Sequence, residues 1–167
     1  MITPATLNDL PVIYSLFEEA IDYQQKNNYT GWKNYDKAFL QRDVESGLLY
    51  KIVNNETICG IFSICYADPL IWREKEKGDA LYLHRIVANR HVNGGPVFEQ
   101  VLDWAKHFAQ GKQLRFIRMD TWAENNKLIG YYRNYGFSFV ETYTTPDTPD
   151  LPLQHRNLSV ALLELVV

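Results

Sequence analysis

Cysteine is scarce in this sequence, and the two that occur, Cys59 and Cys65, lie six residues apart in one apolar segment. An even spacing puts both side chains on the same face of a strand, too far apart along it for a disulfide bond. Small buried thiols are therefore favoured over a disulfide, and also over a metal-binding or redox pair.

Excess charge and long apolar runs are also lacking. There are 17 lysines and arginines against 20 aspartates and glutamates, a formal net charge of −3, whereas a general nucleic-acid binder has a basic face. No apolar run is long enough to cross a bilayer, and the opening MITPATLNDLPVIY has no basic start of the signal-peptide kind. We therefore expect a cytoplasmic protein with neither a nucleic-acid nor a membrane partner.

The periodicity of the apolar residues predicts a mixed α/β fold. A chain of 167 residues suits one domain, so we expect 1–167 to form a single domain. Strand–helix–strand units in the second half favour parallel pairing, and hairpins favour antiparallel pairing. We expect about six to seven strands in a mixed sheet, with about four helices on both faces. The predicted helices are 9–26, 36–46, 96–111 and 125–136, and the predicted strands are 2–3, 48–53, 57–66, 80–88, 113–122, 137–144 and 157–167.

For two further segments the sequence predicts how they are exposed or covered. The mixed charge run WREKEKGD, 72–79, is typical of a solvated loop. The last strand, 157–167, is apolar along almost its whole length, so both of its faces should be covered. An unprotected edge of this kind invites pairing with another chain. We expect a sheet neighbour on each side of this strand or a homodimer contact through it.

Gly94-Gly95-Pro96 lies between the predicted strand 80–88 and the following helix. Glycines ahead of a helix expose backbone N–H groups where the helix dipole favours an anion. Spacing alone favours a plain turn over an anion site. The segment is neither a P-loop, since no Gly-Lys-Ser/Thr follows, nor a dinucleotide fingerprint.

GYYRNYGF, residues 130–137, places four aromatic residues in eight positions at the end of a predicted helix. Tyrosine hydroxyls on a packed face are unfavourable unless they form hydrogen bonds or take part in function. Either the tyrosines line the buried side of the helix with Leu128, or one of the phenols takes part in chemistry.

The order of elements and the residues of 93–137 resemble the GNAT superfamily of acyl-CoA-dependent N-acyltransferases. In that family an asparagine starts a helix that carries a tyrosine before a terminal Gly-Phe. Here Asn125, Tyr132 seven residues later, and Gly136-Phe137 match that pattern. In the family's pyrophosphate loop, Asn93 takes the Gln/Arg position and Pro96 stands at the middle glycine.

The resemblance implies a GNAT-like fold, acetyl-CoA as the acyl donor, no metal, and transfer of the acetyl group to a primary amine by direct attack. Tyr132 would be the general acid toward the leaving sulfur, with Tyr131 and Tyr135 as core residues. His84 is the candidate base, and Asp120 and Glu124 are rival carboxylates. The implied cofactor-binding residues are Ile86, Val87, Ala88, Asn93, Gly94, Gly95, Val97, Phe98 and Asn125.

The acceptor is not identified by the residues, beyond a small molecule or a peptide that carries an amine. Tyr29, Trp32 and Tyr35 would form the floor of an acceptor pocket or, equally, core under a loop. Two alternatives to the enzyme stay open: an acyl-CoA-binding sensor on the same fold with little catalysis, and a protein-interaction domain without a cofactor.

Overall fold

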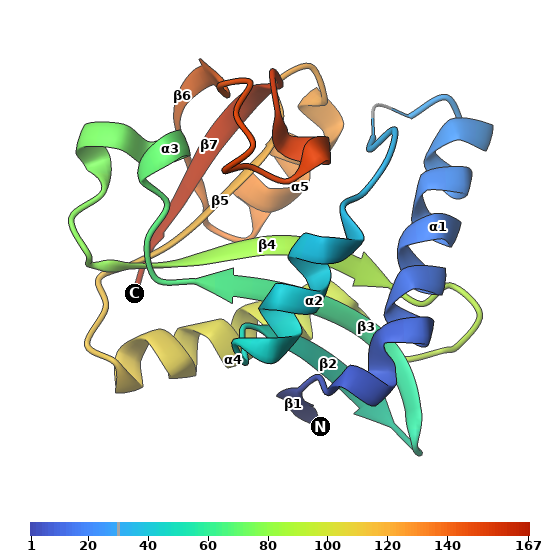
Figure 1. Ribbon diagram of the computed structural model, residues 1–167. Helices are drawn as coiled ribbons and strands as arrows, with labels where there is room; N and C mark the ends of the chain where they lie inside the picture. Colours follow the sequence, from blue (N-terminus) through green and yellow to red (C-terminus); the bar gives the residue numbers. More distant parts are fainter. Residues whose placement is uncertain (30) are drawn as a thin grey trace. The chain divides into compact units, whose positions relative to one another are not determined.

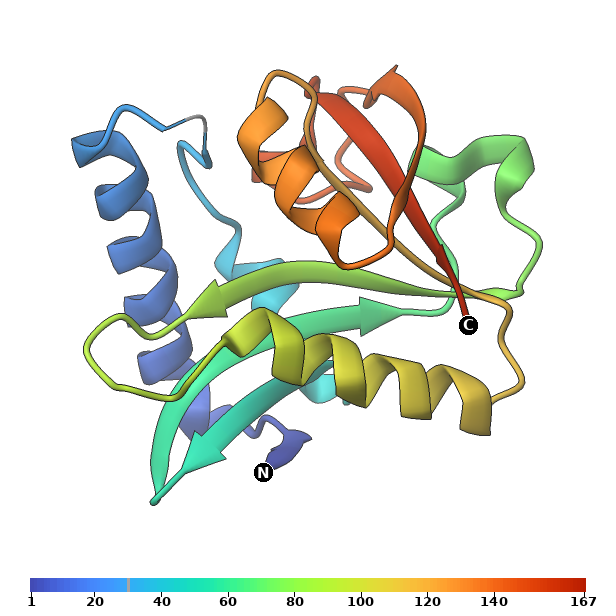
Figure 2. The same ribbon diagram turned by 180° about the vertical axis from the view of Figure 1, so that it is seen from behind.

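The computed structural model describes residues 1–29 and 31–167, which contain five α-helices and a sheet of seven strands (Figures 1 and 2). The strand order is β1-β2-β3-β4-β5-β7-β6, with parallel and antiparallel neighbours. The predicted mixed α/β class is therefore confirmed. The strands are β1 (Ile2–Pro4), β2 (Leu49–Asn54), β3 (Thr57–Cys65), β4 (Ala80–Ala88), β5 (Phe116–Trp122), β6 (Ser138–Thr144) and β7 (Ser159–Val166). The α-helices are α1 (Leu10–Lys26), α2 (Lys37–Glu45), α3 (Pro69–Trp72), α4 (Val97–Gly111) and α5 (Asn126–Asn134).

The chain forms two compact units, one from Met1–Ile64 with His84–Trp104 and the other from Cys65–Leu83 with Ala105–Val167. In the first unit, α1 and α2 pack on the face of the sheet that carries Leu49 and Ile61. The neighbouring residues Tyr50 and Phe62 face the other way, and their rings lie 4.6 and 5.1 Å from the Trp104 ring of α4. Helices therefore cover both faces of these strands, as Figures 1 and 2 show.

Local sequence explains the first two helices. Buried residues of α1 recur at helical spacing from Ile13 to Ile21, and Pro11 lies in the first turn, where its missing N–H is harmless. The Asp36 side chain caps α2 by accepting from the amides of Ala38 and Phe39 at 3.1 and 3.4 Å. The hydrophobic stripe and the caps thus agree with the predicted ends to within about two residues.

In the second unit, β7 lies between β5 and β6 and pairs antiparallel with both. Val160 and Leu162 pack with Trp72 and Tyr82 on one face of β7. On the other face, the side chain of Leu165 approaches Gly136, which follows α5. Of the two alternatives expected for this apolar strand, a neighbour on each side or a homodimer contact, the structure has the first.

The charge run 72–79 is only in part the solvated loop that the sequence predicted: Glu74, Lys77 and Gly78 are exposed, but the start of the run is held in the fold. Trp72 ends α3 and is fully buried, and residues Arg73–Lys75 form a 3-10 turn. Arg73 forms an ion pair with Glu141 of β6, and its guanidinium lies 3.9 Å from the Tyr143 ring centre. Arg73 and Lys75 both pair with Glu141, a partner far away in the sequence that no local pattern reveals. Helix α3 is also the element beyond the four helices that we expected.

Among the helices of residues 1–29 and 31–167, none combines the length and the hydropathy of a membrane span.

Candidate functional site

Strand β4 departs from regular geometry at Arg85. The φ of Arg85 is +52°, in the left-handed region, which costs a side-chain-bearing residue roughly 1–3 kcal/mol. Its Nε donates to the Ser63 hydroxyl at 3.3 Å, and its guanidinium forms an ion pair with Asp43. The side chains of this pair are only 9% and 14% exposed. Buried contacts therefore hold a bend in the strand immediately before residues 86–88.

The three strand residues that the resemblance assigns to the cofactor differ in exposure. Val87 is 3% exposed and packs in the core beneath α1 and α2. Ile86 is half-buried, and Ala88 is exposed at the end of the strand. The fold already uses the Val87 side chain, so a ligand here would meet the backbone of this residue.

Asn89 ties the loop between β4 and α4 to β3. Its amide donates to the carbonyl of Cys59 at 2.8 Å, and its side-chain nitrogen donates to the carbonyl of Ile58 at 2.9 Å. Its side-chain oxygen accepts from the amide of His91 at 3.0 Å. Three hydrogen bonds from one residue thus anchor the start of the loop.

The two glycines of the loop have different reasons to be glycine. A Cβ on Gly94 would lie 2.4 Å from the Cβ of Cys59, so no other residue fits there without displacement. Gly95 has a φ of +74°, and a Cβ on it would meet only the Gln100 side chain at 3.6 Å. Gln100 donates from Nε2 to the carbonyl of Gly94 at 2.7 Å. The loop is therefore packed against β3 at Gly94 and open at Gly95.

Helix α4 begins directly after this loop. The amide of Gln100 donates to the carbonyl of Pro96 at 3.3 Å. The amides of a first helical turn point out along the axis, and the dipole favours an anion there. Asn93 is exposed and Val97 is half-buried, whereas the Phe98 side chain is 7% exposed and belongs to the core. Since Pro96 has no N–H, a pyrophosphate would use the amides that follow it.

The second candidate segment is α5 with its flanking residues. The Asn125 side chain accepts from the amide of Leu128 at 3.0 Å and so caps the helix. At the other end, Gly136 has a φ of +97°, which favours glycine. The match to the family pattern over 125–137 thus coincides with a helix whose two ends are set by these residues.

Tyr132 lies on α5 with its ring 5.5 Å from that of Tyr131 and 6.4 Å from that of Phe137. Burial raises the pKa of the Tyr132 phenol above its ordinary value, and the charges of Tyr131 and Asp120 raise it further. The phenol therefore keeps its proton at neutral pH, which is the state that a general acid requires.

Tyr131 is not the core residue that the sequence predicted, because 40% of it is exposed. Its ring lies 5.1 Å from the half-buried ring of Tyr135, and its hydroxyl donates to the Tyr135 hydroxyl at 3.5 Å. The reason is the position on the helix: a residue next to Tyr132 points about 100° away from it around the axis.

The candidate bases lie on different elements. His84 in β4 and Asp120 in β5 are half-buried, whereas Glu124, just before the cap of α5, is exposed. The assignment of a base stays a prediction.

The aromatic residues proposed as an acceptor floor divide into two groups. Trp32 and Tyr35 pack on Phe17 of α1, with ring centres 5.3 and 5.5 Å away. Tyr35 also donates from its hydroxyl to Glu18 at 2.5 Å. Tyr29 is 51% exposed and its ring lies 6.0 Å from that of Tyr23. Packing thus favours the core interpretation for Trp32 and Tyr35.

Sequence reasoning missed the groups that support the loop and the bend. Asp43, Ser63 and Gln100 carry no local signal for their roles, because each contacts a residue on another element or across a turn. Gly60 does have a local signal, since a glycine inside a strand indicates that another part of the protein approaches its backbone closely. A Cβ on Gly60 would lie 3.0 Å from Val97 and 3.1 Å from the carbonyl of Val87.

No protein-family model matches the chain. The chain is 23% identical over 145 residues, 82% of its own length and 81% of the relative's, to the uncharacterized N-acetyltransferase YesJ of Bacillus subtilis (strain 168). Among solved structures, it resembles an acetyltransferase of the GNAT family from Listeria monocytogenes 4b F2365 with a TM-score of 0.80 and 20% identity, covering 100% of this chain and 94% of that one.

A further similar structure is that of yncA from Salmonella typhimurium with its cofactor acetyl-CoA. Its TM-score is 0.66 at 13% identity, over 99% of this chain and 92% of that one. The protein has the fold of GNAT-family acetyltransferases, which confirms the resemblance predicted from 93–137 and from the order of elements.

Proposed function

We propose that this protein is an N-acetyltransferase that moves an acetyl group from acetyl-CoA to a primary amine by direct attack. The observation that carries the proposal is the start of α4: a loop anchored by Asn89 and Gln100 leads, past the open Gly95, into a helix N-terminus. The GNAT fold and the acetyl-CoA found with yncA support acetyl-CoA as the ligand.

The loop and strand would hold acetyl-CoA in two parts. The first-turn amides of α4 and the exposed residues Asn93 and Gly95 suit a pyrophosphate, because they combine N–H donors with the positive end of a helix dipole. The backbone of residues 86–88, beyond the bend at Arg85, would align the pantetheine arm and donate an N–H to the thioester carbonyl. Neither part requires a metal.

The chemistry needs two proton transfers. A neutral amine nitrogen attacks the thioester carbon, the new C–N bond forms, and the C–S bond then breaks. The nitrogen loses one proton to a base, for which His84, Asp120 and Glu124 are the candidates. The Tyr132 hydroxyl donates its proton to the leaving sulfur and regains one afterwards. The phenol holds this proton at neutral pH, since the pKa of Tyr132 lies above its ordinary value of about 10.

Binding of acetyl-CoA is tested first by thermal unfolding. A ligand at about 100 times its dissociation constant should stabilise the protein by roughly 2.7 kcal/mol. Gly95→Val should weaken acetyl-CoA binding, because it crowds an amide at an open position, and the left-handed φ of Gly95 should add a separate loss of folding stability that is measured without ligand. No shift at millimolar acetyl-CoA would refute both the enzyme and the sensor. Normal binding by Gly95→Val would mean that the pyrophosphate lies elsewhere.

Release of free thiol from acetyl-CoA over a panel of small-molecule and peptide amines separates the enzyme from the acyl-CoA sensor. The relatives' names favour the enzyme. The acceptor amine, a homodimer, a single domain over 1–167 and a cytoplasmic location stay predictions.

A further inference from the structure

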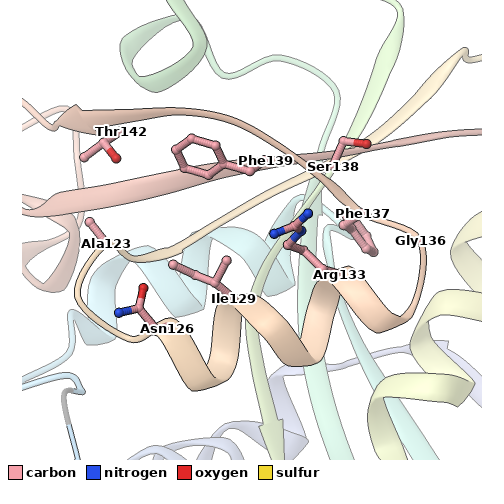
Figure 3. Close-up of a pocket in the computed structure, with 9 residues that line it drawn as sticks. All are labelled: Ala123, Asn126, Ile129, Arg133, Gly136, Phe137, Ser138, Phe139 and Thr142. Atoms are coloured by element: carbon pink, nitrogen blue, oxygen red, sulfur yellow. The ribbon is translucent and has the colours of Figure 1, made fainter.

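A pocket lies between α5 and β6, on residues of the second unit only. Figure 3 shows Ile129 and Arg133 rising from α5, with Phe139 and Thr142 on β6 across from them. The pocket has a volume of about 640 Å³, within the range of about 300–1,000 Å³ that is usual for small-molecule sites. It is open to solvent, since six of its nine lining residues are exposed. None of the residues assigned to acetyl-CoA or to catalysis lines it.

Arg133 is the single charged residue of the lining. Arg133 is exposed, and within the residues that the structure describes its side chain has no ion pair, hydrogen bond or ring contact, while its backbone carbonyl accepts from the amide of Gly136 at 2.9 Å. Each of the other seven arginines has a partner within the protein. Four form ion pairs: Arg73 with Glu141, Arg85 with Asp43, Arg115 with Asp79, and Arg118 with Glu164. The remaining three are Arg42 and Arg90, which lie over the rings of Phe39 and Tyr23, and Arg156, which donates to the carbonyl of Leu151. The fold therefore leaves one guanidinium available to a ligand.

The rest of the lining is apolar or neutral. Phe139 is 49% exposed, an unusual amount for a phenylalanine in a strand, and it shares the pocket with Ile129. Asn126, Ser138 and Thr142 supply hydrogen-bonding groups without charge. Glu141, the acid of the same strand, pairs with Arg73 and Lys75 and does not line the pocket. The pocket thus offers one positive charge beside an exposed ring.

We propose that this pocket binds a small monocarboxylate with an aromatic or branched apolar body. The planar guanidinium of Arg133 matches a carboxylate with two parallel hydrogen bonds. The apolar body would cover Phe139 and Ile129. A phosphate ester fits less well, because a doubly charged group is normally met by more than one cation. This inference is independent of the proposed acetyltransferase activity.

Calorimetric titration of the whole protein with three probes tests the ligand class. 3-Phenylpropionate should bind with a dissociation constant of roughly a millimolar. Its neutral amide, 3-phenylpropanamide, should bind at least about tenfold more weakly, since it lacks the charge. Acetate, which lacks the ring, should also be at least about tenfold weaker. Equal affinity for the acid and the amide, or for acetate and the acid, would overturn the proposal.

Two variants with the same charge change test the site. Arg133→Gln should weaken 3-phenylpropionate binding at least about tenfold and leave the weak binding of the amide unchanged. Lys127→Gln removes an exposed cation from the same helix, outside the pocket, and should change affinity by less than about twofold. Thermal unfolding of both variants checks that they fold. An equal loss in the two variants would overturn the proposal.

Competition with acetyl-CoA and sedimentation of the protein could also contradict the proposal. Displacement of 3-phenylpropionate by acetyl-CoA, with the same loss of acetyl-CoA affinity in Arg133→Gln, would assign the pocket to the cofactor instead. A dimer in sedimentation that becomes monomeric in Arg133→Gln, with no probe binding in either, would make the pocket a contact between copies. No heat signal at roughly 10 mM probe would equally refute the proposal.

Discussion

Helices α4 and α5 begin in different ways: α5 starts at a side-chain cap of its own segment, whereas α4 follows a loop that is packed against β3. At α5, the Asn125 side chain accepts from the amide of Leu128, so the segment satisfies one of its own first amides. At α4, the Gln100 side chain donates to the carbonyl of Gly94 and uses none of the first-turn amides. Under the proposed function, the start of α4 would meet the pyrophosphate, whereas the start of α5 is capped by a side chain of its own segment.

The glycines of the two segments also differ in whether local or distant residues require them. Gly136 ends α5 in a left-handed conformation, a local requirement of the helix end. Gly94 is required by Cys59, which lies 35 residues earlier in the chain. The segment of α5 is thus understood from its own residues, and the loop before α4 only from its neighbours.

Gly94→Val tests whether the loop before α4 depends on its neighbours, and it should have the largest effect of the variants compared. Its Cβ would lie 2.4 Å from the Cβ of Cys59, so β3 and the loop would have to move apart. The free energy of unfolding should fall by about 3 kcal/mol, the upper end of overpacking effects. Urea unfolding followed by circular dichroism measures the loss.

Gly111→Val is the control for that variant, because nothing lies within 4 Å of a Cβ on Gly111. It should lose less than about 1 kcal/mol, mainly through helix propensity. If Gly94→Val were as stable as Gly111→Val, the loop would not be packed against Cys59.

Tyr132→Phe should have the next largest effect. It removes one hydroxyl and keeps the ring, so turnover should fall by about 100-fold while acetyl-CoA affinity barely changes, because the hydroxyl acts only as the sulfur leaves. The measurement is the rate of free thiol release with a saturating amine. Tyr131→Phe and Tyr135→Phe should stay within a few-fold of wild type.

Two results would contradict this role. Normal turnover by Tyr132→Phe with a slow Tyr131→Phe or Tyr135→Phe would mean that another phenol is the acid. Normal turnover by all three would make the tyrosines structural.

Asn125→Ala sharpens the comparison of the two helix starts. The variant leaves the amide of Leu128 without its cap, so the free energy of unfolding should fall by about 1 kcal/mol. Chemical denaturation measures this. Asn134→Ala, at the exposed other end of α5, should change stability by less than about 0.5 kcal/mol. Equal losses in the two variants would show that the cap is unimportant.

The smallest expected effect is on the pH dependence of turnover. The pKa of Tyr132 is raised, so the phenol stays protonated as the pH rises through the ordinary tyrosine value of about 10. Deprotonation of Tyr132 should therefore cause no decrease in turnover at saturating amine between pH 8 and pH 10. A decrease to about half by pH 10 would mean that the acid has an ordinary pKa.

The raised pKa of Tyr132 also predicts how the stability of the protein changes with pH. A phenol whose pKa is raised in the folded protein contributes stability that is fully present below the unfolded value of about 10. That contribution is lost as the pH rises through the higher folded value. Tyr132→Phe should therefore make the protein less sensitive to alkaline unfolding, in the window above about pH 10.

Sequence reasoning was strongest where a pattern is local. The apolar stripe of α1, the limits of α2, strand β7 and the limits of α5 follow from periodicity, capping and glycine, which act within a few residues. It failed at Trp72 and Tyr131, where burial decides the outcome. Nothing in WREKEKGD reveals that Trp72 is fully buried or that Arg73 meets Glu141.

For this protein the sequence by itself determined the class of fold, the order of its elements and the segment that resembles the GNAT pattern at 125–137, because hydrophobic periodicity and helix ends are encoded locally. Only the tertiary structure decided why Gly94 must be glycine, how Arg85 is held in a bent strand, and that Arg133 is left without a partner. Those outcomes depend on atoms that are distant in sequence and close in space, and side-chain contacts of that kind have no local signal.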